Sequence, residues 1–287
     1  MIDVSTFGLV LHHDRQEALE LARDVSSWLT ERDHSVRLPE ADAERCGLGE
    51  FAVADTAFAA GLDAVVSLGG DGTILRTVAL LGGAEVPIIG VNLGQLGYLT
   101  EVEPTGVHEA LDAFLKGAYT VEKRMLLAVG IDSSAVSTDA QVALNEAVLE
   151  KTLSGHTVRL DVLIDGRPFT PYETDGLIIA TPTGSTAYAF SVRSPIIAPT
   201  HRAIMLAPVS PHMLFDRTLV LEPDSMVEVR VAGHRPATLT IDGRVAGELA
   251  VGDAIRCTAS PHSVHLAMFS PRDFTGILKS KFGLSDR

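Results

Sequence analysis

The residues best suited to chemistry are Gly69-Gly70-Asp71-Gly72-Thr73, which surround one carboxylate with glycines. The apolar run Ala64–Leu68 precedes them and a helix-like stretch, Ile74–Leu81, follows, so we expect a buried strand, a tight turn and a helix. Glycines let a phosphate approach the backbone, and the first turn of a helix offers unpaired N–H groups and a positive dipole end. An acid among such amides indicates phosphoryl chemistry on a nucleotide, with Asp71 as the candidate catalytic residue.

Three further segments carry polar groups at the ends of expected strands. They are Gly90–Thr100 with Asn92, the pair Asn145-Glu146, and Asp175–Tyr188, which runs from an acid through a strand into a hydroxyl-rich turn. Each segment taken alone also fits a turn, a helix cap or close packing, because Ser, Thr, Pro and Gly favour turns for local reasons.

Several common motifs are missing from the sequence. There is no Gly-Lys dipeptide and hence no Walker A loop, and the glycines near Asp71 do not fit G-x-G-x-x-G. A G-x-S-x-G nucleophile turn is also absent. The chain therefore lies outside the commonest nucleotide-binding and hydrolase classes.

Alternating strands and helices are expected to position the Asp71 turn. The residues before about 102 read as strand, helix, strand, helix, and such alternation predicts a parallel sheet with ligands at the carboxyl ends of its strands. The expected strands and helices are Thr6–Leu11, a helix carrying Ala18 to Leu29, Val36–Leu38, a helix over Phe51–Ala60, Ala64–Leu68, Ile74–Leu81, Pro87–Asn92 and a helix over Val107–Leu115.

The pattern changes to short strands and hairpin turns from Met125 onward. Asp165-Gly166 and Asp242-Gly243 are good hairpin turns. We predict an α/β domain from residues 1–102 and 267–287 and an all-β domain from residues 103–266. The C-terminal tail, a strand and a helix, is expected to return to the first domain.

Composition limits the partners. The 287 residues carry a formal net charge of −14, which argues against nucleic acid, because nucleic-acid binding rests on clustered Lys and Arg. A phosphate-rich ligand would need local basic groups or a metal ion. Two cysteines are too few for a disulfide framework. No signal-peptide pattern or apolar run of transmembrane length is present, so we expect a cytoplasmic protein without membrane contact.

Taken together and in this order, the four segments resemble the NAD kinases, which phosphorylate the 2′-hydroxyl of the adenosine ribose of NAD to give NADP. The resemblance covers most of the chain. Its carriers are Gly69–Thr73, Asn92-x-Gly94-x-Leu96-Gly97-x-Leu99-Thr100, Asn145-Glu146, and Asp175-Gly176 through Thr181-Pro182-Thr183-Gly184-Ser185-Thr186-Ala187-Tyr188. The last segment is the most specific, because lipid kinases and phosphofructokinases also carry G-G-D-G-T.

The resemblance implies roles for individual residues. Asp71 matches the base that takes the proton of the ribose hydroxyl, and Asn145 and Glu146 match a pair that hydrogen-bonds a ribose. Arg76 and His156 fall where a basic group could reach a phosphate. The nucleotide-binding residues that the resemblance implies are Gly70, Asp71, Gly72, Thr73, Arg76, Asn92, Asn145, Glu146, His156, Asp175, Thr183, Ser185, Thr186, Ala187, Tyr188 and Ser191.

The resemblance further implies ATP or polyphosphate as the donor and a divalent metal, Mg²⁺, held through the donor phosphates and Asp71. It implies a β-rich domain that binds NAD and pairs in a homodimer or homotetramer. Two alternatives stay open from the sequence: a catalytically impaired NAD-binding sensor, and a lipid or small-molecule kinase that shares only the G-G-D-G-T turn. The donor, the choice between NAD and NADH, and effectors are not fixed by the sequence.

One departure from the family pattern lies after Ser191. The family usually continues A-G-G-P, whereas this chain has Arg193 and Ser194 in place of the two glycines. Because glycines permit unusual backbone angles, the sequence predicts an altered loop there.

Overall fold

The computed structural model describes residues 4–94, 97–136 and 141–284, and the chain divides into two compact units. Unit 1 comprises residues 1–123 and 264–287, and unit 2 comprises residues 124–263. The return of the C-terminal tail to the first unit follows the sequence prediction. The boundary between the units lies after residue 123, whereas the sequence predicted it after residue 102. The difference arises because the helix α4 (Val107–Leu115) packs into the core of unit 1 through Val107, Leu111 and Phe114.

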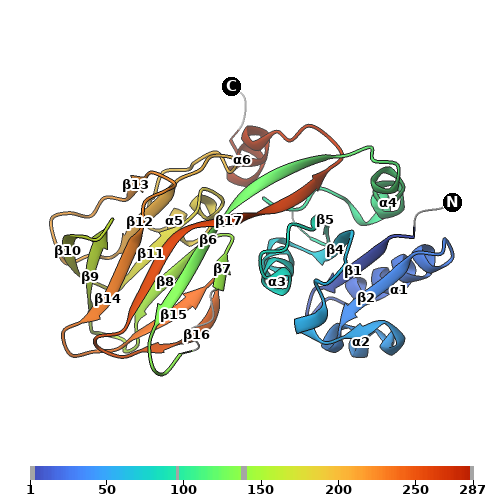
Figure 1. Ribbon diagram of the computed structural model, residues 1–287. Helices are drawn as coiled ribbons and strands as arrows, with labels where there is room; N and C mark the ends of the chain where they lie inside the picture. The colour runs from blue at the N-terminus through green and yellow to red at the C-terminus, as the bar shows by residue number, and fades with distance from the viewer. Residues whose placement is uncertain (1–3, 95–96, 137–140, 285–287) are drawn as a thin grey trace. The chain divides into compact units, whose positions relative to one another are not determined.

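Unit 1 is an α/β domain around a parallel sheet (Figure 1). The strands run in the order β5-β4-β1-β2-β3, and each pairs parallel with its neighbours in this order. Their bounds are β1 Thr6–Leu11, β2 Ser35–Pro39, β3 Ala52–Val53, β4 Ala64–Gly69 and β5 Pro87–Asn92. The helices are α1 Gln16–Thr30, α2 Glu40–Cys46, α3 Asp71–Leu81, α4 and the C-terminal α6 Phe274–Phe282.

The sequence prediction was wrong for residues 51–60. In place of a helix the structure has single 3₁₀ turns at Gly49–Phe51 and Asp55–Ala57 on either side of β3. Ala52 and Val53 pair with Leu38 and Pro39 of β2, so hydrogen bonding to the sheet edge outweighs the local helical pattern. The short helix α2 was not predicted, because seven residues are too few for a clear periodicity.

Unit 2 consists mainly of two antiparallel sheets. One contains β10-β9-β14-β17 with β6 and β7, and the other has the order β13-β12-β11-β8-β15-β16. Their bounds are β6 Thr120–Asp132, β7 Gln141–Ala143, β8 Glu146–Lys151, β9 Val158–Ile164, β10 Arg167–Thr174, β11 Gly176–Ala180, β12 Ile204–Val209, β13 Leu219–Leu221, β14 Val227–Ala232, β15 Ala237–Ile241, β16 Arg244–Leu249 and β17 Ala254–Met268. The unit is not purely β, because a 3₁₀ turn (Thr183–Thr186) and the one-turn helix α5 (Tyr188–Ser191) follow β11.

The strand β11 is buried on both faces. On one face Leu177 and Ile179 join the core that lies between the two sheets. On the other face Ile178 and Ala180 pack with Ala189 of α5. This second layer holds the turn that follows β11 firmly against its sheet.

The long strand β17 is shared by both units. Its first part pairs antiparallel with β14 in unit 2, and His265 and Leu266 pair parallel with Pro87 and Ile88 of β5 in unit 1. Among the described residues, no helix combines the length and the apolar character needed to cross a membrane.

Candidate functional site

The glycine-rich turn lies between β4 and α3, as predicted, and places Asp71 as the first residue of the helix. Gly70 is the N-cap residue, and its carbonyl accepts hydrogen bonds from the N–H groups of Thr73 (2.9 Å) and Ile74 (3.2 Å). No side chain caps this helix. The N–H groups of its first turn therefore form a site suited to an anion.

The glycines of the turn serve two different purposes. Gly69 is required by packing, because a Cβ there would overlap the buried side chain of Thr73. Gly70 and Gly72 are different: a Cβ on either would meet no atom within 4 Å, and neither has a positive φ. Since the protein itself does not need glycine at these two positions, they leave open space in front of the helix N-terminus.

Asp71 is held by the loop that follows β5. Its Oδ2 accepts a hydrogen bond from the N–H of Tyr98 (2.8 Å) and its Oδ1 one from the N–H of Leu99 (2.9 Å). Burial and the nearby Asp71 charge raise the pKa of the Tyr98 phenol. A Cβ on Gly97 would overlap Asp71 Oδ1, so glycine is needed for this approach. Each carboxylate oxygen keeps a second acceptor position, and the orientation of the group is fixed.

Asn92, at the end of β5, is buried beside this loop. Its Nδ2 donates to the carbonyl of Gly94 (3.2 Å), while its Oδ1 has no hydrogen-bond partner among the described residues. Asn92 thus has an unused acceptor near the carboxyl end of the sheet. The neighbouring residues Gln95 and Leu96, the second of which belongs to the predicted motif, lie outside the described residues.

Arg76 is engaged within unit 1. Its Nη1 donates to both carboxylate oxygens of Asp42 (2.9 and 2.8 Å) and to the carbonyl of Leu11 (3.1 Å). Asp42 is fully buried and also accepts from the N–H of Leu11. The structure therefore uses Arg76 to neutralise a buried acid at the end of β1, which leaves it less available to a phosphate than the sequence prediction supposed.

In unit 2, Asn145 and Glu146 are held by Asp242, which the sequence had marked only as part of a hairpin turn. The Asp242 carboxylate accepts hydrogen bonds from the N–H groups of Leu144 (2.7 Å), Asn145 (2.8 Å) and Glu146 (3.1 Å). Asp242 has a φ of +48°, a conformation in which Asp is tolerated better than most residues. The Asp-Gly pair was the available signal for this role.

Glu146 is buried, and its Oε2 has no hydrogen-bond partner among the described residues. Burial, with the added charge of Asp242, raises the pKa of Glu146 to about 8, although a hydrogen bond from the N–H of Tyr188 acts the other way. At neutral pH the side chain is therefore mainly protonated and can both donate to and accept from a pair of hydroxyl groups.

The turn after β11 lies directly against Asn145. The N–H of Thr181 donates to the carbonyl of Asn145 (2.8 Å), and a Cβ on Gly184 would overlap that same carbonyl. Ser185 is fully buried and exchanges hydrogen bonds with the backbone of Ile197, and Thr183 accepts from Arg124. The Asn145 segment and the turn after β11 are thus in direct backbone contact.

Tyr188 and Asp175 are positioned by groups on β8. The Tyr188 hydroxyl donates to Glu150 (2.8 Å), and Asp175 accepts from Lys151 (2.6 Å). Burial and the interaction with Glu150 raise the pKa of Tyr188 to about 12, so it remains a hydroxyl donor. Thr186 and Ala187 are half-buried beside them. These residues lie on, or close in sequence to, β8 and β11, two strands of unit 2 that pair with each other.

Two predicted residues lie at more exposed positions. His156 is exposed in the connection between β8 and β9, and Ser191 is exposed at the end of α5. Arg193, where the family usually has glycine, is exposed and has a φ of +63°. Arg193 therefore adopts the left-handed backbone conformation that glycine favours. The sequence had predicted an altered loop at this position. Ser194 is buried and shares a hydrogen bond with Thr218 (2.8 Å).

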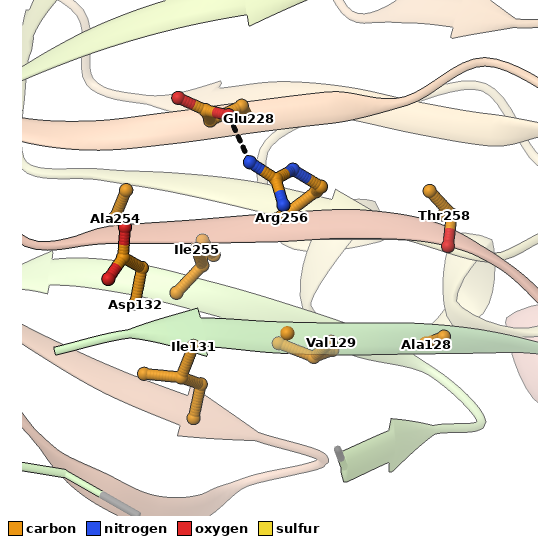
Figure 2. Close-up of a pocket in the computed structure, with 10 residues that line it drawn as sticks. Ala128, Val129, Ile131, Asp132, Glu228, Ala254, Ile255, Arg256 and Thr258 are labelled. Carbon is orange, nitrogen blue, oxygen red and sulfur yellow. Dashed lines mark hydrogen bonds and ion pairs between the residues drawn. The ribbon is translucent and has the colours of Figure 1, made fainter. Parts of the chain in front are cut away.

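Unit 2 contains a pocket of about 350 Å³ lined by residues of β6, β14 and β17. Figure 2 shows these residues. Arg256 and Glu228 form an ion pair there (2.9 Å), and none of the sequence-predicted site residues lines it. Within residues 4–94, 97–136 and 141–284, no group of three or more His, Cys, Asp or Glu side chains is arranged to hold a metal ion.

Two family models match the chain. The ATP-NAD kinase N-terminal domain matches residues 7–119, and the ATP-NAD kinase C-terminal domain matches residues 144–269. The chain is 38% identical to an NAD kinase of Geobacter metallireducens over 93% of this chain and 94% of the relative. It is 35% identical to an NAD kinase of Heliobacterium modesticaldum over 96% of this chain and 98% of the relative.

Two solved structures share the fold. A yeast NADH kinase complexed with NADH has a TM-score of 0.90 and 24% identity, and the match covers 99% of this chain and 89% of that one. An NAD kinase from Archaeoglobus fulgidus in complex with ATP has a TM-score of 0.72 and 24% identity, with 98% and 100% covered. At this identity the two structures support the fold rather than individual contacts.

Proposed function

The chain belongs to the NAD kinase family, and we propose that it transfers a phosphoryl group from ATP to the 2′-hydroxyl of the adenosine ribose of NAD, giving NADP. The observation that carries this proposal is the placement of Asp71. A carboxylate with a fixed orientation lies at an uncapped helix N-terminus beside two glycines that the protein itself does not need. The uncapped helix N-terminus suits the phosphates of a donor, and the Asp71 carboxylate suits the hydroxyl group of an acceptor.

Asp71 would act on the ribose hydroxyl. A hydroxyl that attacks phosphorus must lose its proton as the bond forms, and a carboxylate oxygen can accept it. A carboxylate is a weak base toward an alcohol, so orientation of the nucleophile supplies most of the effect. The hydrogen bonds from Tyr98 and Leu99 fix that orientation before the substrate binds.

The Asn145-Glu146 pair and the Asp175–Tyr188 segment of unit 2 would bind the dinucleotide. The protonated Glu146 and the neighbouring Asn145 suit the vicinal hydroxyls of a ribose, since donors and acceptors are both present. Tyr188 offers a ring face with a hydroxyl, and Asp175 and Thr186 lie near it. We retain Thr73, Thr183, Ser185 and Ala187 as residues that shape these surfaces, and His156 and Ser191 as exposed contacts.

We include a divalent metal, Mg²⁺, bound chiefly through the phosphates of the donor, with Asp71 as the candidate protein ligand. Such an ion neutralises charge that develops on the transferred group, and Mg²⁺ commonly binds through one or two carboxylates plus substrate phosphates. The acidic chain, with a net charge of −14, needs such a counter-charge near a triphosphate. We also expect a homodimer or homotetramer, as the family resemblance implies.

The two alternatives receive no support. A lipid or other small-molecule kinase that shares only the Asp71 turn would match over that region, whereas the NAD kinases of Geobacter metallireducens and Heliobacterium modesticaldum match over 93% and 96% of this chain. A sensor without catalysis would have no need of an oriented Asp71.

The test is NADP formation from NAD with Mg²⁺, using ATP and inorganic polyphosphate as donors in parallel. We expect turnover with ATP. Activity with polyphosphate as well would widen the donor class. Tight NAD binding without NADP formation under both donors would contradict the proposed reaction.

A further inference from the structure

The C-terminal segment of unit 1 contacts the loop that holds Asp71. Arg272, just before α6, donates from Nη2 to the carbonyl of Tyr98. The N–H of this same Tyr98 donates to Asp71. Tyr98 is therefore held at two atoms, by the Asp71 carboxylate at its N–H and by the Arg272 guanidinium at its carbonyl.

Arg272 is itself fixed in place. Its side chain is only 8% exposed, and its Nη1 lies 3.5 Å from Glu122 Oε1 in an ion pair whose acid is 17% exposed. A guanidinium presents several N–H groups in a rigid fork, so it can bind a carbonyl and a carboxylate at once. Because the pair is largely shielded from water, its orientation is not lost to screening as it would be at the surface.

Two further contacts hold the same pair of segments together. The Glu101 carboxylate accepts hydrogen bonds from the N–H groups of Phe269 (3.1 Å) and Ser270 (2.8 Å). The ammonium of Lys281, on α6, lies 4.6 Å from the centre of the Tyr98 ring. The loop 97–101 thus contacts Asp71 on one side and residues 268–282 on the other.

We propose that Arg272 is a positioning residue for phosphoryl transfer, which acts by holding the Tyr98 peptide so that the Tyr98 and Leu99 N–H groups orient Asp71. The proposal rests on the catalytic role given to Asp71 under the proposed function. It assigns a part in catalysis to a residue about 200 positions away in the sequence. No motif in the sequence marks Arg272.

The first test compares the full-length Arg272→Ala variant with Arg23→Ala, a control in which another arginine of unit 1 loses a bond to a backbone carbonyl, that of Cys46 (2.8 Å). In Arg272→Ala we expect kcat to fall ten- to hundredfold, since small misplacements of reacting groups cost about that much. The KM values for NAD and ATP should stay within about threefold. Arg23→Ala should keep the wild-type kcat. An unchanged kcat in Arg272→Ala would overturn the proposal.

The second test measures amide hydrogen exchange of Tyr98 and Leu99 in the native protein. Hydrogen bonds to charged groups contribute enough that losing one should speed exchange by roughly tenfold or more. We expect faster exchange in both Arg272→Ala and Asp71→Asn, and no change in Arg23→Ala. If the two amides exchange at the wild-type rate in Arg272→Ala, Arg272 does not hold the loop.

Two conservative variants separate positioning from general destabilisation. Arg272→Lys keeps a single donor group, which can bind either the Tyr98 carbonyl or Glu122. Its kcat should therefore lie between those of the wild type and Arg272→Ala. Glu122→Gln keeps the bond from Arg272 to Tyr98 and should lower kcat by less than threefold. If Glu122→Gln lowers kcat as much as Arg272→Ala does, activity does not depend on the bond from Arg272 to the Tyr98 carbonyl, which Glu122→Gln keeps, and the proposal is overturned.

The double variant Asp71→Asn/Arg272→Ala tests whether Arg272 acts through Asp71. Residues that act as a unit are non-additive, so the double variant should have the kcat of Asp71→Asn within about twofold. A further tenfold loss would contradict the proposed route. If Asp71→Asn alone retains the wild-type kcat, the role given to Asp71 fails, and the exchange rates in Arg272→Ala still decide whether Arg272 orders the loop.

Discussion

Substituting Gly72 by alanine should stabilise the protein and impair the enzyme. Gly72 lies in the first turn of α3, is exposed, and has open space where a Cβ would lie. Its φ is not positive, so alanine fits the existing backbone. Alanine is favoured over glycine within a helix by about 0.5–1 kcal/mol. For a chain of this size that corresponds to an increase in Tm of roughly 1–3 °C.

Activity should change in the opposite direction. A methyl group in front of the helix N-terminus would occupy the space that we assign to the phosphates, and a displacement of about 1 Å can cost roughly a hundredfold in rate. We expect kcat/KM to fall at least about tenfold in Gly72→Ala, measured as NADP formation. Gly49→Ala is the matched control, because Gly49 is also exposed, has an ordinary φ and open space, and lies in a short 3₁₀ helix. Full activity in a stabilised Gly72→Ala protein would refute the reasoning.

Two further substitutions test other parts of the structure. Because the folded pKa of Glu146 is raised to about 8, the protonated side chain stabilises the fold fully below its unfolded pKa of 4.5, and this contribution is lost as pH rises toward 8. The free energy of unfolding of the wild type should therefore fall, relative to that of Glu146→Gln, by up to ~1.4 kcal/mol per pH unit between pH 4.5 and about 8. A difference between the two proteins that does not change with pH would contradict the raised pKa of Glu146. Arg193→Gly should raise the free energy of unfolding by about 0.5 kcal/mol, measured with denaturant. The left-handed φ of Arg193 destabilises a non-glycine residue by more than the extra chain entropy of glycine in the unfolded state does. Val192→Gly is the control and should lower the free energy of unfolding, because Val192 has an ordinary φ of −98°.

The elements of unit 1 were largely predictable because their signals are local. Strands such as Ala64–Gly69 are continuous apolar runs, and α1 has a clear stripe of buried residues. The segment 51–60 failed because pairing with β2 decides its structure, and a local pattern does not report on a strand neighbour. The domain boundary failed for a similar reason, since the sequence shows that α4 is a helix but not which core it joins.

The sequence predicts candidate site residues from their motifs, but it does not predict the contacts that support them. It marked Asp71, Asn145, Glu146 and the turn at 181–188. Asp242 binds the N–H of Asn145 across 97 residues, and Arg272 binds the carbonyl of Tyr98 across 174 residues. The ion pair between Arg76 and Asp42 could not be predicted either, because Asp42 lies in α2, a helix that the sequence did not predict. Long-range polar contacts of this kind depend on the finished fold.

The most direct test of the central claim is a single-turnover measurement of NADP formation in Asp71→Asn, with NAD binding measured on the same protein by calorimetry. Asparagine keeps the size of the side chain but cannot take a proton from the ribose hydroxyl. The account predicts NAD affinity within a few-fold of the wild type and a rate of phosphoryl transfer lower by about a hundredfold or more. A wild-type rate in a variant that binds NAD normally would contradict it.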